Sequence, residues 1–425
     1  MIQVINQSKN QALIDKLFSR SQFDFSRVNE DVQAIIENVK NNKDQAVKAY
    51  TKKFDQAVIE TFRVSDTLIE SALNLIDKTL YEDLKNAAKN IERFHEAQKQ
   101  ESYTLTLEGN AKVSQRIKPI ETVGIYVPGG KAAYPSTVLM NAIPAKIAGV
   151  KKIVMITPPS SEGTIKDAIL VAANIAGVDE IYTVGGAQGI AALTFGTETI
   201  PKVDKIVGPG NIYVAIAKKI VSGYVGIDMI AGPSEIVIIA DETANPDYIA
   251  ADLMSQAEHD ELASAILLTP SETLAKKVKQ SLEAQILTLE RQVIIREALR
   301  DYGAIVITNT IEEAINITNK IAPEHLEILT ENPNLIVDHI ENAGAIFLGP
   351  YTPEPVGDYF AGPNHTLPTS TTSRFSSALS TSDFYKKTSI IQYTKAAFDN
   401  AKESIIRLAN EEGLTAHALS IKVRK

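Results

Sequence analysis

The chain has 425 residues, a formal net charge of −9 and no cysteine, and 44% of its residues are hydrophobic. This length predicts about two to four globular domains, and the acidic balance argues against nucleic acid as the main partner. The missing cysteines exclude disulfides, thiolate metal ligands and a cysteine nucleophile, and no apolar run reaches the ~18 residues that a membrane span requires.

The N-terminal quarter of the chain has a helical pattern. Residues 1–22 are polar and are expected to form an N-terminal arm, without the basic and apolar regions of a signal peptide. We therefore expect a cytoplasmic protein. Helical periodicity with charged faces continues over 29–100 and predicts a helical layer. His95 lies among Arg93, Glu96 and Lys99 and is expected on its surface.

From about residue 121 the pattern changes to strands, glycine turns and helices. TVGIYVPGG, KKIVMITPP, EIYTVGGAQG and DKIVGPGN each place an apolar, β-rich run before a turn. Helices are expected over 135–149 and 165–177, and Asn211 is expected to begin another. Repeats with this spacing predict a parallel sheet with right-handed crossovers.

Residues 228–260 combine a turn, a strand and a helix with polar residues at its end. AGPSE precedes an apolar run at 236–240, and Asn245-Pro246 is a good helix start. Gln256 and His259 are three residues apart on this helix and therefore share one face. Pairs with this spacing are also common on ordinary helix surfaces.

The alternation of strands and helices then continues to a long loop. SAILLTP, GAIVIT and GAIFLG are expected strands, 271–299 and 309–320 are expected helices, and APEHLE precedes an apolar run. Residues 349–383 are rich in Pro, Gly, Ser and Thr and contain Asp358 and His365. A loop of this length is more often functional than not. A short strand near Phe384 and a helix to about residue 410 precede EEGLTAHALS.

Together these elements predict an α/β fold with two Rossmann-like parallel-sheet domains, one inserted in the other. We assign 1–22 to an N-terminal arm and 121–235 to the inserted domain. Residues 23–120 and 236–378 would form the other domain, and 379–425 a C-terminal tail.

The chemistry-bearing residues have ordinary alternatives. The glycine turns could hold a phosphate at a helix N-terminus, but none matches G-x-G-x-x-G, and tight turns explain them equally well. Glu324-His325 is either an acid–base pair or a solvated pair. His339 and His417 are interpreted as helix-surface residues. Gln256, His259, Asp358 and one further histidine could ligate zinc or another first-row metal through nitrogen and oxygen.

Over nearly its whole length the sequence resembles the histidinol dehydrogenase family. The resemblance rests on IYVPGG, STVLMNAIPAKIAGV, VGGAQGIAAL, GPGN, the block from AGPSE to QAEHD, APEHLE, GDYFAGPNHTLPT and EGLTAHA. It implies that the chain oxidises L-histidinol through L-histidinal to L-histidine with two NAD⁺, in the last steps of histidine biosynthesis. It also implies a homodimer in which the tail crosses to the partner's active site.

The resemblance assigns roles residue by residue, with one zinc ion per subunit. The zinc ligands would be Gln256, His259, Asp358 and His417. Glu324 and His325 would be the catalytic pair. The dinucleotide would contact Tyr126, Gln188 and Asn211. The substrate would contact Ser234, His365 and Glu412 together with Gln256, His259, His325, Asp358 and His417.

The absence of cysteine restricts the mechanism expected for the aldehyde step. A neutral histidine suits removal of the hydroxyl proton, and we expect His325 to do this. Without a thiolate, water must add to the aldehyde directly, and Glu324 is the candidate that activates it. We expect the zinc to orient the substrate. Two alternatives remain open: a zinc hydrolase with Glu324 as base, which leaves Tyr126, Gln188 and Asn211 without a role, and a non-catalytic metal-dependent binding protein.

Overall fold

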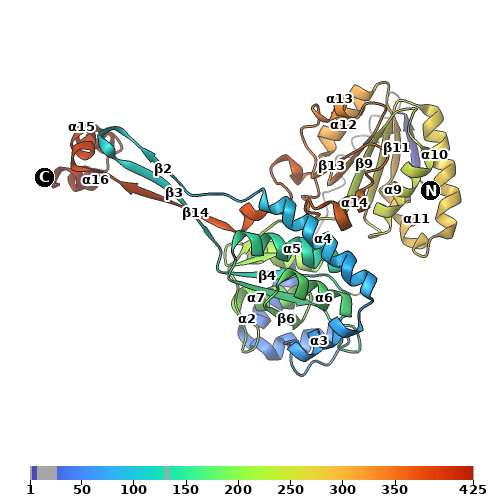
Figure 1. Ribbon diagram of the computed structural model, residues 1–425, viewed down its shortest axis with the longest axis horizontal. Helices are drawn as coiled ribbons and strands as arrows, with labels where there is room; N and C mark the ends of the chain where they lie inside the picture. Colours follow the sequence, from blue (N-terminus) through green and yellow to red (C-terminus); the bar gives the residue numbers. More distant parts are fainter. Residues whose placement is uncertain (1, 7–25, 130–133, 425) are drawn as a thin grey trace.

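The computed structural model describes residues 2–6, 26–129 and 134–424. It contains two lobes, each built on a parallel sheet covered by helices, and a long arm that projects from one side (Figure 1). The predicted α/β class, with two parallel sheets, is therefore confirmed. Within the described ranges, no helix combines the length and the apolar character that crossing a membrane requires.

The first lobe contains a five-stranded parallel sheet with the order β6-β5-β4-β7-β8. Its strands are β4 (Thr122–Tyr126), β5 (Lys152–Thr157), β6 (Glu180–Thr183), β7 (Lys205–Val207) and β8 (Gly226–Ile227). Its helices are α5 (Pro135–Ala148), α6 (Asp167–Ala176), α7 (Gly186–Phe195) and α8 (Ile212–Val221), as the repeated pattern predicts. Because the strand order reverses at β4, a crevice is expected at the carboxyl ends of β4 and its neighbours.

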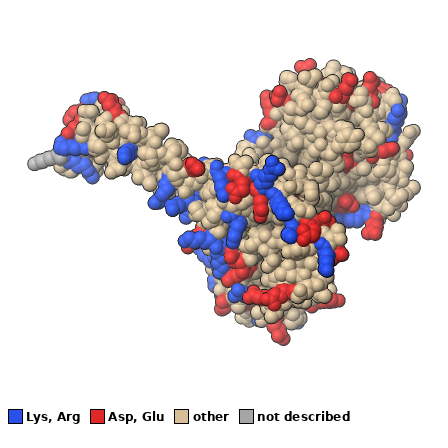
Figure 2. Space-filling model, viewed as in Figure 1, with Lys and Arg blue, Asp and Glu red and all other residues tan. Residues whose placement is uncertain are grey.

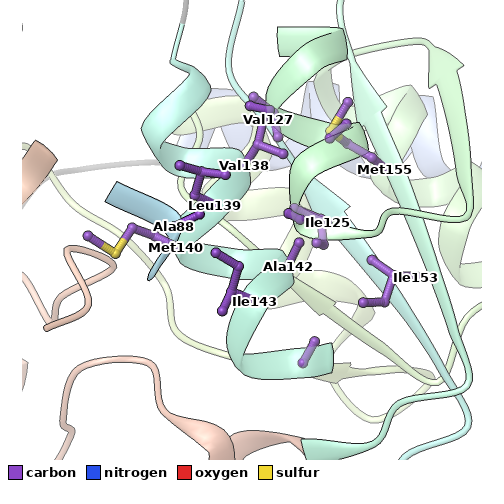
Figure 3. Packing of buried hydrophobic residues seen from close by; sticks show 14 of the residues in the cluster. Ala88, Ile125, Val127, Val138, Leu139, Met140, Ala142, Ile143, Ile153 and Met155 are labelled. Atoms are coloured by element: carbon purple, nitrogen blue, oxygen red, sulfur yellow. The ribbon is translucent and has the colours of Figure 1, made fainter. Parts of the chain in front are cut away.

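The core of this lobe lies between the sheet and α5. Ile125 and Ile153 extend from the sheet toward Leu139 and Ile143 of α5, and Ala88 joins them from a further helix (Figure 3). All five side chains are buried. Their burial from water is the main favourable term that holds α5 on the sheet.

The N-terminal helices cover the first lobe, not the second. They are α2 (Ser26–Phe54), α3 (Asp66–Leu75) and α4 (Lys78–Glu96). The helix α2 packs on α7 and α8, α3 on α6, and α4 on α5. The assignment of 23–120 to the domain of 236–378 is therefore wrong for these helices. Helical periodicity shows that an apolar face exists, but not which surface covers it.

Residues 103–119 belong to the arm, which is a second correction to the domain assignment. There β2 (Tyr103–Thr106) and β3 (Lys112–Pro119) form an antiparallel sheet with β14 (Tyr385–Gln392). The end of the arm carries the helices α15 (Lys395–Glu411) and α16 (Thr415–Lys422). The pairing of Arg116 with Thr388 joins segments far apart in the sequence, which no local pattern could reveal.

The second lobe contains a six-stranded parallel sheet with the order β1-β11-β10-β9-β12-β13. Its strands are β1 (Gln3–Asn6), β9 (Glu235–Ala240), β10 (Ser264–Thr269), β11 (Ala304–Ile307), β12 (His325–Leu329) and β13 (Ala345–Leu348). Its helices are α9 (Pro246–Ala257), α10 (Glu272–Gln285), α11 (Gln292–Asp301), α12 (Ile311–Ile321) and α13 (Asn334–Val337). Asn245 caps α9 as predicted, because its side chain accepts a hydrogen bond from the Asp247 amide.

Two predictions about this lobe are wrong. The helix expected over 271–299 is interrupted by a 3₁₀ turn at Ile286–Thr288 and the residues after it. The start of the expected N-terminal arm is the edge strand β1, which pairs with β11 and buries Ile2 and Ile5. Four residues are too few to show a period, so the local sequence did not reveal this strand. Residues 7–22 of the expected arm lie outside the described residues.

A long loop connects the lobes and carries candidate site residues. It contains α14 (Glu354–Val356), a π-helical turn (Gly357–Ala361) and the 3₁₀ turns Thr372–Arg374 and Thr381–Phe384. The Asn364 side chain donates to the Met140 carbonyl of α5 at 2.5 Å, and the Thr369 hydroxyl accepts from the Gly232 amide at 2.6 Å. These bonds fix the loop between the lobes.

His95 is a core residue and not the surface residue that its neighbours in the sequence suggest. It is 0% exposed, its Nδ1 donates to the Ile91 carbonyl at 2.8 Å, and Asn364 Nδ2 lies 3.4 Å from its Nε2. The charged neighbours occupy other faces of α4. Burial lowers the pKa of His95, so the folded protein keeps the ring neutral.

We expect His95→Ala to lower the free energy of unfolding by about 1–3 kcal/mol, because buried packing and hydrogen bonds are lost. The unfolded histidine takes up a proton below its ordinary pKa of about 6.5 while the folded one resists, so wild type loses stability as pH falls below that value. The variant lacks this contribution, so the difference in unfolding free energy between wild type and variant should become smaller in acid. Urea unfolding at several pH values measures it, with exposed His339→Ala as control. An unchanged stability would contradict the assigned role.

Candidate active site

Glu324 and His325 lie at the amino edge of the second sheet, where β12 begins. Both are buried, and the first residue of β9 holds both through its backbone. Glu324 Oε2 accepts from the Glu235 amide at 2.9 Å, and His325 Nδ1 lies 3.1 Å from the Glu235 carbonyl oxygen. A carbonyl only accepts, so Nδ1 carries the proton of the neutral ring. Nε2 is therefore left as a base.

The environment keeps this imidazole neutral. Burial lowers the pKa of His325 to about 4, although the negative charge of Asp358 opposes this. Burial also raises the pKa of Glu324 well above its ordinary value. A carboxylate with a raised pKa is a stronger base than an exposed one. Burial thus favours the uncharged form of each side chain, while the hydrogen bond from the Glu235 amide favours the carboxylate of Glu324.

A carboxyl pair from the long loop faces the free nitrogen of His325. Glu354 Oε1 lies 3.9 Å from His325 Nε2, and His325, Glu354 and Asp358 each offer a ligand atom within 4.8 Å of the others. Burial, and next the nearby Asp358, raise the pKa of Glu354 to about 10. Burial alone would raise the pKa of Asp358, but the hydrogen bond and charge of His365 outweigh it, and the pKa is about 2.

Gln256 and His259 approach the same edge because α9 runs antiparallel to the strands and ends there. Gln256 is 0% exposed, and neither polar atom of its side chain has a hydrogen-bond partner within the described parts of the chain. Burial lowers the pKa of His259, while the charge of Asp358 raises it, so Asp358 lies near both histidines. An unpartnered amide, a neutral imidazole and a carboxylate fit a divalent metal ion well.

Two predicted substrate contacts border this cluster. His365 Nδ1 lies 3.6 Å from Asp358 Oδ1 and 3.2 Å from the Asp358 carbonyl oxygen. Ser234 directly precedes Glu235, and its carbonyl accepts from the Ser264 amide at 2.9 Å. The structure therefore brings both residues to the edge where Glu324 and His325 lie.

His417 and Glu412 are not part of this cluster within one chain. Both are exposed. They lie at the end of the arm, His417 on α16 and Glu412 at the end of α15. Figures 1 and 2 show this end of the arm projecting away from both lobes. One chain thus gathers Gln256, His259 and Asp358 but leaves the fourth predicted ligand elsewhere.

The three predicted dinucleotide contacts gather at the carboxyl edge of the first sheet. Tyr126 ends β4, and its hydroxyl accepts from the Gly186 amide at 3.3 Å. Gln188 lies in the first turn of α7, and its Oε1 is buried without a partner in the described chain. Asn211 caps α8 by accepting from the amides of Tyr213 and Val214. This edge is where the strand order predicts a crevice.

Sequence reasoning missed Glu354. A signal was available, because Glu354 and Asp358 are four residues apart and the segment forms consecutive helical turns. This spacing was not recognised as helical because the loop lacks the periodic apolar residues that would predict a helix. The alternative of a solvated pair is wrong for Glu324-His325, since both residues are buried and His325 is the first residue of β12.

Comparisons with known proteins agree with this geometry. The family model described as "Histidinol dehydrogenase" matches residues 18–425. The chain is 56% identical to histidinol dehydrogenase of Clostridium acetobutylicum over 92% of this chain and 91% of the relative. It is 55% identical to that of Listeria innocua over 97% of each chain.

The chain is also similar to solved structures. The crystal structure of histidinol dehydrogenase from Elizabethkingia anophelis has a TM-score of 0.94 and 42% identity, covering 100% of this chain and 98% of that one. Betaine aldehyde dehydrogenase from Staphylococcus aureus has a TM-score of 0.51 at 14% identity, covering 88% and 84%. The second likeness concerns the fold alone.

Proposed function

Because the chain belongs to the histidinol dehydrogenase family, a family of oxidoreductases, we propose that it oxidises L-histidinol through L-histidinal to L-histidine with NAD⁺. The observation that supports this most is the pairing of a neutral His325 with Glu324 beside the cluster of Gln256, His259 and Asp358. The hydrolase alternative is not retained, because the family is one of oxidoreductases. We propose the cytoplasm as the compartment, since the family acts in histidine biosynthesis.

In the alcohol step, His325 would remove the hydroxyl proton. Its Nδ1 proton is held by the Glu235 carbonyl, so Nε2 is the atom that accepts. Burial keeps the ring neutral far below physiological pH, and the base is therefore ready in every molecule. When bound, NAD⁺ supplies the acceptor for the hydride that leaves the carbinol carbon.

In the aldehyde step, the chain must use water, because it has no cysteine that could form a thioester. Glu324 would take a proton from that water as it adds to the carbonyl carbon. The resulting hydrate passes the second hydride of the reaction to a second NAD⁺, and His325, once it has released the first proton to solvent, again accepts the hydroxyl proton. The hydrogen bond from the Glu235 amide favours the carboxylate form of Glu324, which this role requires.

A zinc ion would be held by Gln256, His259 and Asp358, with His417 of a second chain completing the set. The unpartnered amide of Gln256 supports this placement, because a buried amide without a partner costs free energy unless a ligand satisfies it. When bound, the ion supplies a template that orients the imidazole and amine of the substrate.

A dinucleotide would be held by Tyr126, Gln188 and Asn211 at the carboxyl edge of the first sheet. The buried Gln188 Oε1 without a partner in the described chain supports this, as it does for Gln256. The loop between the lobes carries Asp358 and His365 and is bonded to both lobes.

A homodimer with crossed arms would bring His417 and Glu412 to a partner's site. The end of the arm exposes apolar side chains, among them Leu408 at 66% and Leu419 at 58%. Such a surface is unfavourable in water unless another surface covers it. A second copy that buries it would also place the two polar residues.

The test of this function is stoichiometry. With limiting L-histidinol and excess NAD⁺, we expect two NADH per substrate and no free aldehyde, because one acid–base pair serves both oxidations. Absorbance at 340 nm measures the NADH, and a carbonyl reagent traps any aldehyde. One NADH with released aldehyde would exclude the two-step reaction, and no NADH would exclude the function.

A further inference from the structure

The first lobe contains a buried ion pair that no step above uses. Lys218 on α8 and Asp228, which follows β8, have side chains only 1% exposed and form a close ion pair. Lys218 Nζ also donates to the Gly208 carbonyl at 2.9 Å. Asp228 Oδ2 accepts from the Gly208 amide at 2.8 Å. The pair thus holds both polar groups of one residue.

Gly208 has a conformation that needs to be held. Its φ is +111°, and an added Cβ would lie 2.2 Å from the Tyr126 carbonyl oxygen. Only glycine adopts this backbone readily, but free glycine also populates other conformations. The two hydrogen bonds of the ion pair therefore select one conformation among several.

Gly208 begins the segment that leads to Asn211. A Cβ on Gly210 would lie 3.0 Å from the Tyr126 ring, so the segment lies against that ring before Asn211 caps α8. Two of the three proposed dinucleotide contacts thus depend on the path of Gly208–Asn211. Asp228 also accepts from the Met229 amide at 2.6 Å, where the chain leaves for the second lobe.

Stability alone gives little reason for such a pair. Taking two charges out of water costs free energy that their attraction often fails to repay, and apolar replacements are frequently as stable. Because Lys218 and Asp228 both bond to the backbone of Gly208, the pair instead fixes the position of the segment that Gly208 begins.

We propose that Lys218 and Asp228 are positioning residues for dinucleotide binding. They hold the segment 208–211 against Tyr126 so that Asn211 and Tyr126 meet the dinucleotide in one arrangement. This inference rests on the proposed function, because it concerns the NAD⁺ site of the same reaction.

The experiment compares Lys218→Met, Asp228→Asn and the double variant with wild type in the full-length zinc-loaded enzyme. In each, we expect the KM for NAD⁺ and its calorimetric Kd to rise about 10- to 100-fold, as for misplacement of a binding group. The KM for L-histidinol should stay within about two-fold, since that site lies at another sheet. Lys152→Met, which removes the Lys152–Glu180 pair of the same sheet, is the matched control and should leave both values unchanged.

The double variant separates positioning from stability. It leaves no uncompensated buried charge, so its Tm should lie near that of wild type even where the single variants are unstable. A wild-type Tm with a raised KM for NAD⁺ supports positioning. A KM for NAD⁺ that stays at, or returns to, the wild-type value overturns it. If wild type itself makes no NADH from histidinol, the proposed function fails instead, and calorimetric NAD⁺ binding still decides the role of the pair.

Discussion

His325→Ala is expected to slow both half-reactions by about 10²–10⁴-fold, the usual cost of losing a general base. The reason is geometric: His325 is the neutral imidazole whose Nδ1 is fixed by Glu235 and whose Nε2 is free to accept a proton. NADH formation is measured separately with histidinol and with histidinal. Exposed His339→Ala is the matched control and should behave as wild type. An alanine variant within a few-fold of wild type would remove His325 from the mechanism.

Glu324→Gln is expected to affect the aldehyde step and the alcohol step differently. Glutamine keeps the oxygen that accepts from the Glu235 amide, so the local fold should persist while proton acceptance is lost. We expect oxidation of supplied histidinal to be slowed most, because that step alone adds water. Should this variant oxidise histidinal normally and fail only on the alcohol, the roles of Glu324 and His325 are reversed.

The second large effect is the recovery of activity from two inactive variants. His325→Ala and His417→Ala are each expected to be inactive, the first without its base and the second without a metal ligand. The two are mixed, unfolded and refolded together. In a hybrid dimer with crossed arms, one site collects both defects and the other has none. With random pairing about half the dimers are hybrids, so about a quarter of all sites should be wild type.

The physical reason is the position of His417. His417 is exposed near the end of an arm that projects away from both lobes (Figure 1), while Gln256 and His259 lie at the amino edge of the second sheet. If the arm folds back onto its own chain, every site keeps one defect and the mixture stays inactive. Hybrid dimers are verified by mass-tagging one variant. Their presence without activity would refute the crossed arrangement.

Much of the architecture followed from local pattern. Apolar runs, glycine turns and helix caps predicted β4 to β7, β9 to β11, β13, α5 to α9 and the caps at Asn211 and Asn245, because these signals act over a few residues. The absence of cysteine excludes a thioester intermediate, so that water must add directly to the aldehyde in any aldehyde oxidation by this chain.

The tertiary structure decided what those signals leave open. No local pattern shows that α2 covers α7, that 112–119 pairs with 385–392, or that residues 3–6 complete a sheet whose other strands begin at 235. A face or an edge can be covered by any complementary surface. The same holds for the site. Spacing paired Gln256 with His259, but only the antiparallel course of α9 brings them to the edge where His325 and Glu354 meet. Burial, which sequence does not show, then raises the pKa of Glu324 and Glu354 and lowers that of His325.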